Sequence, residues 1–184
     1  MNDSIFLSIK DPRTQEITIH HLLSHSAGWS NKEPDPMFNH IFLAHQMDTS
    51  LPLSMETIIQ YVLKQPLNFA PGTQSSYSNF GYAVLGEVIE KISGESYENY
   101  VKNHILYPLG IYDMQLGGTH YYQRYPNEVS YYPFPSSYQV LAVDGSEKLV
   151  EKPYGGNNME TLAAAGGWVA SAPDLVKFLL AIDG

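Results

Sequence analysis

The sequence of 184 residues contains no cysteine, which excludes disulfide bonds, zinc–thiolate sites and cysteine nucleophiles. Basic residues are scarce: 10 Lys and Arg stand against 19 Asp and Glu, and the formal net charge is −9. An acidic chain without a basic run disfavours nucleic acid or an anionic membrane as partner. No apolar stretch approaches the roughly 20 residues that cross a bilayer, and the opening residues lack the pattern of a signal peptide. These absences leave the compartment open.

The composition that remains describes a folded, acidic globule. Apolar residues make up 43% of the chain and charged residues 16%, which argues against disorder. The length suits one domain, or part of a larger one, and can bury a core. Composition therefore indicates a globular class but no function.

The first half of the chain predicts mainly helices. Thr18 is a suitable N-cap for a first short helix, and Gly28 is a suitable residue to end it. Ile58 and Val62 belong to a clear helical pattern that Pro66 stops. The predicted elements are a strand over residues 5–9, a helix over 19–25, a loop over 30–36, and helices over 37–46 and from Ser54 to Pro66.

Two further helices follow in the middle of the chain. Asn79 is predicted to cap the first, which runs to about Ile92 with Glu87, Glu90 and Lys91 facing water. Its predicted apolar stripe is Val84, Leu85, Val88, Ile89 and Ile92. Ser96 is predicted to cap the second, whose predicted buried side is Tyr100, Val101, His104 and Ile105.

The second half changes in texture, because eight of the fourteen tyrosines lie between residues 112 and 154 and helical periodicity fades. Residues 137–143 and 148–152 flank Asp144-Gly145-Ser146 and predict a β-hairpin. The small residues 163–170 predict a close approach of backbone to another element. Ser171 is predicted to cap a final helix with an apolar face of Leu175, Phe178, Leu179 and Ile182. The pattern is mostly α with a small β part.

Three histidines, His20, His21 and His25, are the first candidates for chemistry. On a helix, His21 and His25 would share a face, which is a metal-ligand spacing. No glutamate follows the first histidine and no nearby acidic residue completes a site, so we favour structural hydrogen bonds over a metal. A metal-dependent activity through His21 and His25 remains a distant alternative.

Tyr77-Ser78-Asn79 is the second candidate. A tyrosine at the junction before a helix can direct its hydroxyl into a cleft, and an asparagine two residues on can hold a polar group. By itself so short a motif is typical of a helix cap with a packed aromatic ring, because a phenol with its pKa near 10 is a poor base.

Four blocks in fixed order resemble the serine β-lactamase and penicillin-binding-protein-like family, closest to its class C β-lactamase, esterase and D-aminopeptidase side. They are residues 17–28 (ITIHHLLSHSAG), 69–86 (FAPGTQSSYSNFGYAVLG), 104–114 (HILYPLGIYDM) and 166–175 (GGWVASAPDL). Ordered agreement over residues 17–178 is far more specific than any single block.

The resemblance implies an α+β fold of the β-lactamase/transpeptidase type. Residues 1–184 would be a partial domain, with a helical subdomain over 17–115 and a Tyr-rich hairpin region and final helix over 116–184. It also implies that Tyr77 is the general base or hydrogen-bonds the nucleophile, and that Asn79 contacts the substrate. A neighbouring cation lowers the pKa of such a phenol, which makes it a usable base.

The family's nucleophile motif is missing from the sequence. None of the eight lysines has serine three residues before it, and neither Lys-Thr-Gly nor His-x-Gly is present at the end of the chain. No Gly-x-Ser-x-Gly motif replaces them. We therefore expect a middle fragment of a serine hydrolase that cleaves amide or ester bonds through an acyl-enzyme, inactive as this chain alone.

The expected partners are a small-molecule or peptide substrate (a β-lactam, an ester or a D-amino-acid peptide), with no nucleic acid and no transmembrane segment. No cofactor is expected. The alternative is a non-catalytic module that binds peptide, peptidoglycan or a protein partner. We also expect the exposed apolar faces of the first and last elements to promote self-association or partial disorder. The tyrosines of residues 121–138 are expected to pack rather than to line a substrate groove.

Overall fold

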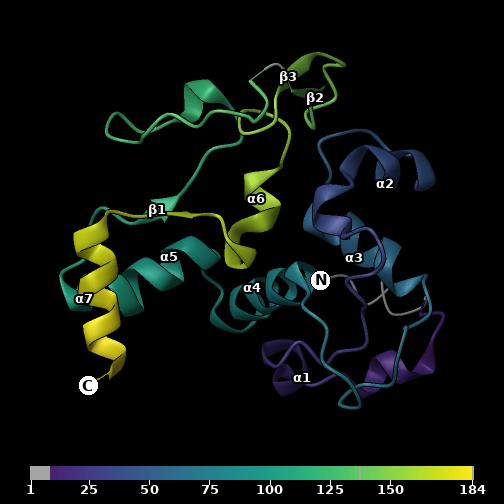
Figure 1. The fold of residues 1–184 in the computed structure, drawn as a ribbon. Coiled ribbons are helices and arrows are strands. Elements are labelled where there is room, and N and C mark those ends of the chain that lie inside the picture. The colour runs from purple at the N-terminus through teal and green to yellow at the C-terminus, as the bar shows by residue number, and fades with distance from the viewer. Residues whose placement is uncertain (1–8, 137, 184) are drawn as a thin grey trace.

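The computed structural model describes residues 9–136 and 138–183. The predicted strand over residues 5–9 lies outside them, apart from Ile9. Helices and short helical turns dominate, and the strands are short, so the fold is α+β as expected (Figure 1). The α-helices are α1 Ile19–Leu23, α2 His40–Gln46, α3 Met55–Leu63, α4 Asn79–Ser93, α5 Tyr97–Val101, α6 Met159–Leu162 and α7 Ala172–Asp183.

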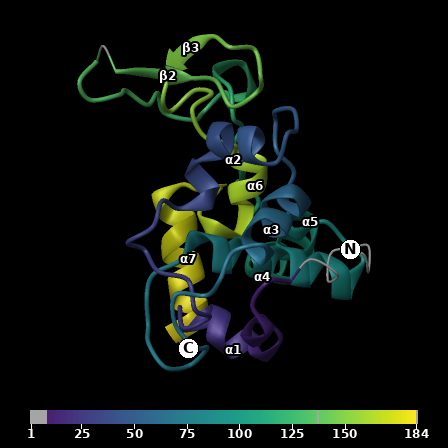
Figure 2. The ribbon, with the colours of Figure 1, turned by 90° about the vertical axis from the view of Figure 1, so that its right-hand side faces the viewer.

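The described strands form two separate antiparallel pairs. β1 Gln115–Leu116 pairs with β4 Trp168–Val169, which joins the segment after α5 to the segment before α7. β2 Gln139–Leu141 pairs with β3 Leu149–Glu151, with Val140 opposite Val150. The second pair confirms the predicted hairpin. It lies at the end of the molecule opposite α1 in both views (Figures 1 and 2).

α4 is the central element of the helical part, in contact with α1, α5, α6 and the 3₁₀ turn Ala163–Ala165. Its fully buried residues are small or near its start: Phe80, Gly81, Ala83 and Gly86. The predicted stripe is therefore wrong, since Ile92 is 77% exposed and the rest of the stripe is half-buried. The reason is close packing: a Cβ on Gly86 would lie 2.9 Å from the Cβ of Ala164. This contact confirms the close approach predicted for residues 163–170.

The helices before α4 follow the sequence pattern with two corrections. α1 is capped by Thr18 as predicted, since the Thr18 hydroxyl accepts the N–H of His21, but the helix ends at Leu23 rather than at His25. The predicted helix over 37–46 is divided into a 3₁₀ turn Pro36–Phe38, capped by Asp35, and α2. α3 begins after Ser54, which caps it, as predicted.

The helix after Ser96 is also irregular. α5 continues into a π-helical turn Lys102–Leu106 and a 3₁₀ turn Tyr107–Leu109. A π turn shifts the side chains that follow it around the axis. Leu106 is consequently buried, whereas the predicted core residues His104 and Ile105 are exposed.

The apolar side chains form two described clusters. The larger joins α2, α3, the start of α4 and α6, with Met37, Leu43 and Ile58 fully buried. The smaller is built on Leu106, Ile111 and Met114, against which Trp168 and Phe178 pack. The larger cluster supports the pocket described below.

α7 begins as predicted, because the Ser171 hydroxyl accepts the N–H of Asp174. Its predicted apolar face, however, is mostly solvent-exposed. Only Phe178 of that face packs into the smaller cluster. The large apolar side chains of α7 that are exposed are Leu175, Val176, Leu179, Leu180 and Ile182.

Candidate functional site

The Tyr77-Ser78-Asn79 segment leads directly into α4. Ser78 has extended backbone angles (φ −144°, ψ 111°), and its hydroxyl accepts the N–H of Gly81. Ser78 is therefore the N-cap, and the prediction that Asn79 caps this helix is wrong. Because Asn79 is the first residue of α4 and has no capping role, its side-chain amide is free to bond elsewhere.

Tyr77 is held by its ring and by its hydroxyl. The ring lies against the imidazole of His25, with centroids 4.6 Å apart, and that imidazole also contacts Tyr82 at 4.9 Å. The Tyr77 hydroxyl donates to Oδ1 of Asn79 at 3.0 Å. The Tyr77 residue nevertheless remains 58% exposed, so its phenol is open to solvent on one side.

His25 connects α1 to this segment. It leaves the helix with φ 54°, a left-handed conformation that is uncommon for residues other than glycine. Its carbonyl accepts the N–H of Ser76 at 2.8 Å, and its Nδ1 accepts the N–H of Ser78 at 3.2 Å. These bonds fix the segment of Tyr77 against the end of α1.

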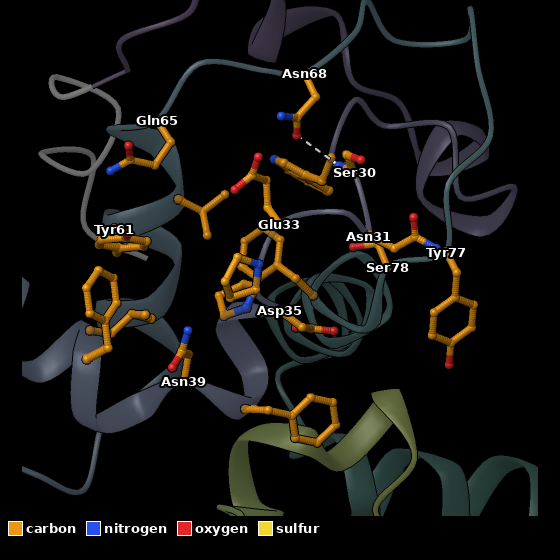
Figure 3. Close-up of a pocket in the computed structure, with 18 of the residues that line it drawn as sticks. Ser30, Asn31, Glu33, Asp35, Asn39, Tyr61, Gln65, Asn68, Tyr77 and Ser78 are labelled. Carbon is orange, nitrogen blue, oxygen red and sulfur yellow. Dashed lines mark hydrogen bonds between the residues drawn. The ribbon is translucent and has the colours of Figure 1, made fainter.

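A pocket of about 770 Å³ lies beside Tyr77 (Figure 3). Figure 3 shows Glu33 and Asp35 between Tyr61 and Gln65 on one side and Tyr77 on the other. Aromatic rings supply much of the lining: Trp29, Phe38, Phe42, Tyr61, Tyr77 and Phe80. In the part of the chain that the structure describes, the lining residues fall between residues 29 and 80. The volume is in the range of small-molecule binding sites.

The pocket walls are fixed by contacts between distant parts of the sequence. The N–H of Ser30 donates to Oδ1 of Asn68 at 2.9 Å, drawn as a dashed line in Figure 3. The N–H of Asn68 donates in turn to the carbonyl of Gly28. Gly28 has φ +117°, and a Cβ there would lie 2.8 Å from the carbonyl oxygen of Phe69. Only glycine fits this close approach.

The charge of the pocket is one-sided. Among the described residues, its lining includes the acidic residues Glu33 and Asp35 and no lysine, arginine or histidine. Burial of His40 at the start of α2 lowers the pKa of its imidazole. His40 is 2% exposed, and among the described residues neither ring nitrogen has a hydrogen-bond partner. Burial at the start of α2 thus favours the neutral form of the His40 imidazole.

The histidine spacing that suggested a metal does not place its members on one helical face. α1 ends before His25, whereas His21 lies within it. The Nδ1 of His21 accepts the N–H of Thr18 at 3.3 Å. His25 uses its Nδ1 for Ser78. Among residues 9–136 and 138–183, no group of three or more His, Asp or Glu side chains is arranged to hold a metal ion.

A membrane-spanning helix is likewise absent from the described part of the chain, where none is both long and apolar enough.

The tyrosines of residues 121–138 do not line the pocket beside Tyr77. Tyr121 packs edge-on against Tyr154, and the Tyr125 hydroxyl donates to the carbonyl of Leu116, while Tyr122 and Tyr132 are exposed. Packing thus accounts for part of this stretch only.

The structure brings the candidate residues Tyr77 and Asn79 together and adds Asp35, which the sequence motif does not include. The Asn79 amide Nδ2 donates to Oδ2 of Asp35 at 2.8 Å. The signal available in the sequence was Asp35-Pro36, since an acidic residue before proline is typical of the start of a helical turn. Nothing local indicated that this carboxylate faces a residue 44 positions away.

A family model described as Beta-lactamase matches residues 6–184. The chain is 33% identical over 175 residues to the putative fimbrial assembly protein FimD, serogroup D, of Dichelobacter nodosus, covering 94% of this chain and 38% of that protein. It is 31% identical over 177 residues to the putative penicillin-binding protein PbpX of Bacillus subtilis (strain 168), covering 94% and 37%. The chain therefore spans less than two fifths of these relatives.

The fold also resembles a solved structure. The D-stereospecific amidohydrolase from Streptomyces sp. aligns with a TM-score of 0.59 and 27% sequence identity, over 91% of this chain and 47% of that one. The similarity thus extends along most of this sequence, while more than half of each of these three proteins has no counterpart in it.

Proposed function

Because this chain belongs to the beta-lactamase family, we propose that it forms the helical part of a serine hydrolase that cleaves amide or ester bonds. Residues 17–115 form the helical subdomain in this proposal, and residues 116–184 the hairpin region and final helix. Tyr77 serves as general base or hydrogen-bonds the nucleophile, and Asn79 contacts the substrate. Tyr77 at the rim of the large pocket is the observation that carries the proposal.

The proposed reaction needs a serine that this sequence does not identify, since no Ser-x-x-Lys is present. That serine oxygen attacks the carbonyl carbon of the substrate, and its proton passes through Tyr77 to the leaving amine or alcohol. The bond to the leaving group breaks and an acyl-enzyme forms. Water then attacks the acyl carbonyl, releases the acid and returns a proton to the serine.

The pocket favours an acyl group with apolar or aromatic character. Aromatic walls provide large contact areas for such a group, and the acidic lining disfavours a carboxylate within the pocket. Similarity to a D-stereospecific amidohydrolase supports an amide substrate. The proposed substrate classes remain a β-lactam, an ester or a D-amino-acid peptide.

Intact-mass spectrometry tests the proposal directly. The folded chain is incubated with a fluorophosphonate and, separately, with a penicillin. We expect no adduct, because the chain has no Ser-x-x-Lys nucleophile. A stoichiometric adduct that maps to one serine and disappears in Tyr77→Phe would overturn the inactivity of the chain alone. In a longer protein that contains the nucleophile, the same Tyr77→Phe change should slow acylation by about 10²- to 10⁴-fold.

A binding role without catalysis is the second candidate, favoured by a large pocket in a sequence that lacks the nucleophile motif. The two candidates differ in one measurement. If the longer reading frame contains an upstream Ser-x-x-Lys whose serine is acylated, the hydrolase is supported. If a complete protein without that motif binds a peptidoglycan peptide and leaves it intact, the binding module is supported.

A further inference from the structure

Asp35 lies on the far side of Asn79 from Tyr77, and the three side chains form a continuous hydrogen-bond chain. The Tyr77 hydroxyl donates to Oδ1 of Asn79 at 3.0 Å, and Nδ2 of Asn79 donates to Oδ2 of Asp35 at 2.8 Å. These two hydrogen bonds link the segment at the start of α4 to the loop before α2. The last of the three side chains is the Asp35 carboxylate, and it decides which group is the donor in both hydrogen bonds.

The direction follows from donor and acceptor chemistry alone. An ionised carboxylate only accepts hydrogen bonds, so the amino group of the Asn79 amide must face Asp35. The amide carbonyl then faces Tyr77, and a carbonyl oxygen also only accepts. The Tyr77 hydroxyl must therefore be the donor. We propose that Asp35 is a positioning residue that sets the orientation of Asn79 and thereby the direction of the Tyr77 proton.

The consequence for Tyr77 rests on the function proposed above. With its proton directed at Asn79, the phenol oxygen presents its lone pairs to its exposed side, where a serine hydroxyl could donate to it. Without Asp35 the amide can rotate and present its amino group to the phenol oxygen. That amino group would then occupy a lone pair that the hydrogen bond from the serine hydroxyl requires.

Asp35 is itself fixed by the turn that it begins. Its Oδ1 accepts the N–H of Met37 at 2.9 Å, and Pro36 occupies the first position of the turn. Met37 is fully buried in the larger cluster. One carboxylate oxygen therefore anchors the side chain, and the other is held toward Asn79.

The capping role and the positioning role can be separated by substitution. Serine caps helical turns about as well as aspartate, but its short side chain offers no carboxylate to Asn79. Asp35→Ser therefore preserves the cap and removes the positioning contact. Glu33→Gln is the matched control, because it removes one negative charge from the same pocket and Glu33 has no described bond to Asn79.

The readout is the nuclear magnetic resonance signal of the Asn79 side-chain amide, assigned by its loss in Asn79→Ala. In the wild-type chain, one amide proton should resonate downfield and exchange slowly with solvent. In Asp35→Ser we expect the downfield signal to be lost, exchange to become faster and the Tyr77 ring signals to shift. The thermal midpoint should stay at the wild-type value, and Glu33→Gln should retain the wild-type signals.

Unchanged Asn79 and Tyr77 signals in Asp35→Ser would overturn the proposal. An acid titration of the wild-type chain provides a second test without any variant. The Asn79 amide signal should move in step with the carboxylate carbon of Asp35, and an Asn79 signal that ignores that titration would also overturn it. Neither readout requires turnover, so failure of the hydrolase proposal would be seen separately, as absence of acylation in the longer protein.

Discussion

The imidazole of His40 is buried at the start of α2 without a described hydrogen-bond partner, and that burial lowers its pKa. The folded chain therefore keeps His40 neutral at a pH where the unfolded chain, with an ordinary histidine pKa near 6.5, takes up a proton. Protonation then favours the unfolded state. The contribution of His40 to stability is complete above pH 6.5 and falls as the pH falls toward its folded pKa.

His40→Leu should remove this pH dependence. We expect the wild-type chain to lose up to about 1.4 kcal/mol of unfolding free energy for each pH unit below 6.5, and the variant to lose less. The measurement is the urea midpoint at pH 7.5, 6.5 and 5.5. His45→Gln, which changes an exposed histidine of the same helix, is the control and should follow the wild-type slope. Parallel slopes for His40→Leu and wild type would contradict the assignment.

At the same scale, a local motif in the sequence pointed to some residues of the candidate site and not to others, for a physical reason. Tyr77 and Asn79 are two positions apart, so a local motif was enough to bring them together. Asp35 and the pocket ring Trp29 are brought to them by packing of distant segments, which no local pattern records. The burial of His40 could not be predicted from the sequence either, because it depends on packing between distant segments.

Among the elements, α4 depends on the absence of one side chain. Gly86→Ala would place a Cβ within 2.9 Å of the Ala164 Cβ, closer than two carbon atoms can pack. We expect a destabilisation of about 1–3 kcal/mol, although alanine is the better helix former. The measurement is the urea midpoint of Gly86→Ala. Ala164→Gly in the same chain should recover much of the loss.

Gly81 provides the matched control on the same helix. A Cβ there would meet the Ser78 hydroxyl at 3.6 Å, which is an ordinary contact. Gly81→Ala should therefore be neutral or stabilising by up to about 1 kcal/mol. Equal effects of the two alanine substitutions would mean that the contact with Ala164 does not limit packing.

The size of the buried residues explains which helices the sequence could predict in detail. α3 was located correctly, because its buried residues Ile58, Ile59 and Val62 are large and follow the helical period. Its start lies within one residue of the prediction, whereas it ends at Leu63, before the predicted stop at Pro66. α4 was located correctly, but its buried face was not, since small residues carry no apolar signal and yet permit the closest approach. The π turn after α5 also escaped prediction, because one extra residue in a turn leaves the apolar pattern almost unchanged.

For the whole molecule, the exposed apolar face of α7 predicts self-association. Leu179 and Leu180 are 62% and 69% exposed on one short helix. Burying one leucine contributes about 1.5–3 kcal/mol, so Leu179→Glu with Leu180→Glu should weaken association by more than tenfold. Sedimentation velocity over a concentration series measures the effect.

Ile92→Gln is the control for this prediction, because Ile92 is 77% exposed on α4, away from the face of α7. It should leave the association unchanged. A wild-type chain that sediments as a monomer at every concentration, and unfolds in one sharp transition, would show that the α7 face is not adhesive.

The pocket beside Tyr77 has a wider consequence for how such proteins change. Within residues 9–136 and 138–183, its lining comes from one uninterrupted stretch, residues 29–80, and α4 to α7 contribute to it only through Phe80. A single recombination event that replaces this stretch could therefore exchange the described pocket lining, with Asp35 and Tyr77 included, and leave α5 to α7 as they are. In this architecture the shape and charge of the pocket can change by exchange of residues 29–80 as one segment, without coordinated substitutions in distant parts of the gene.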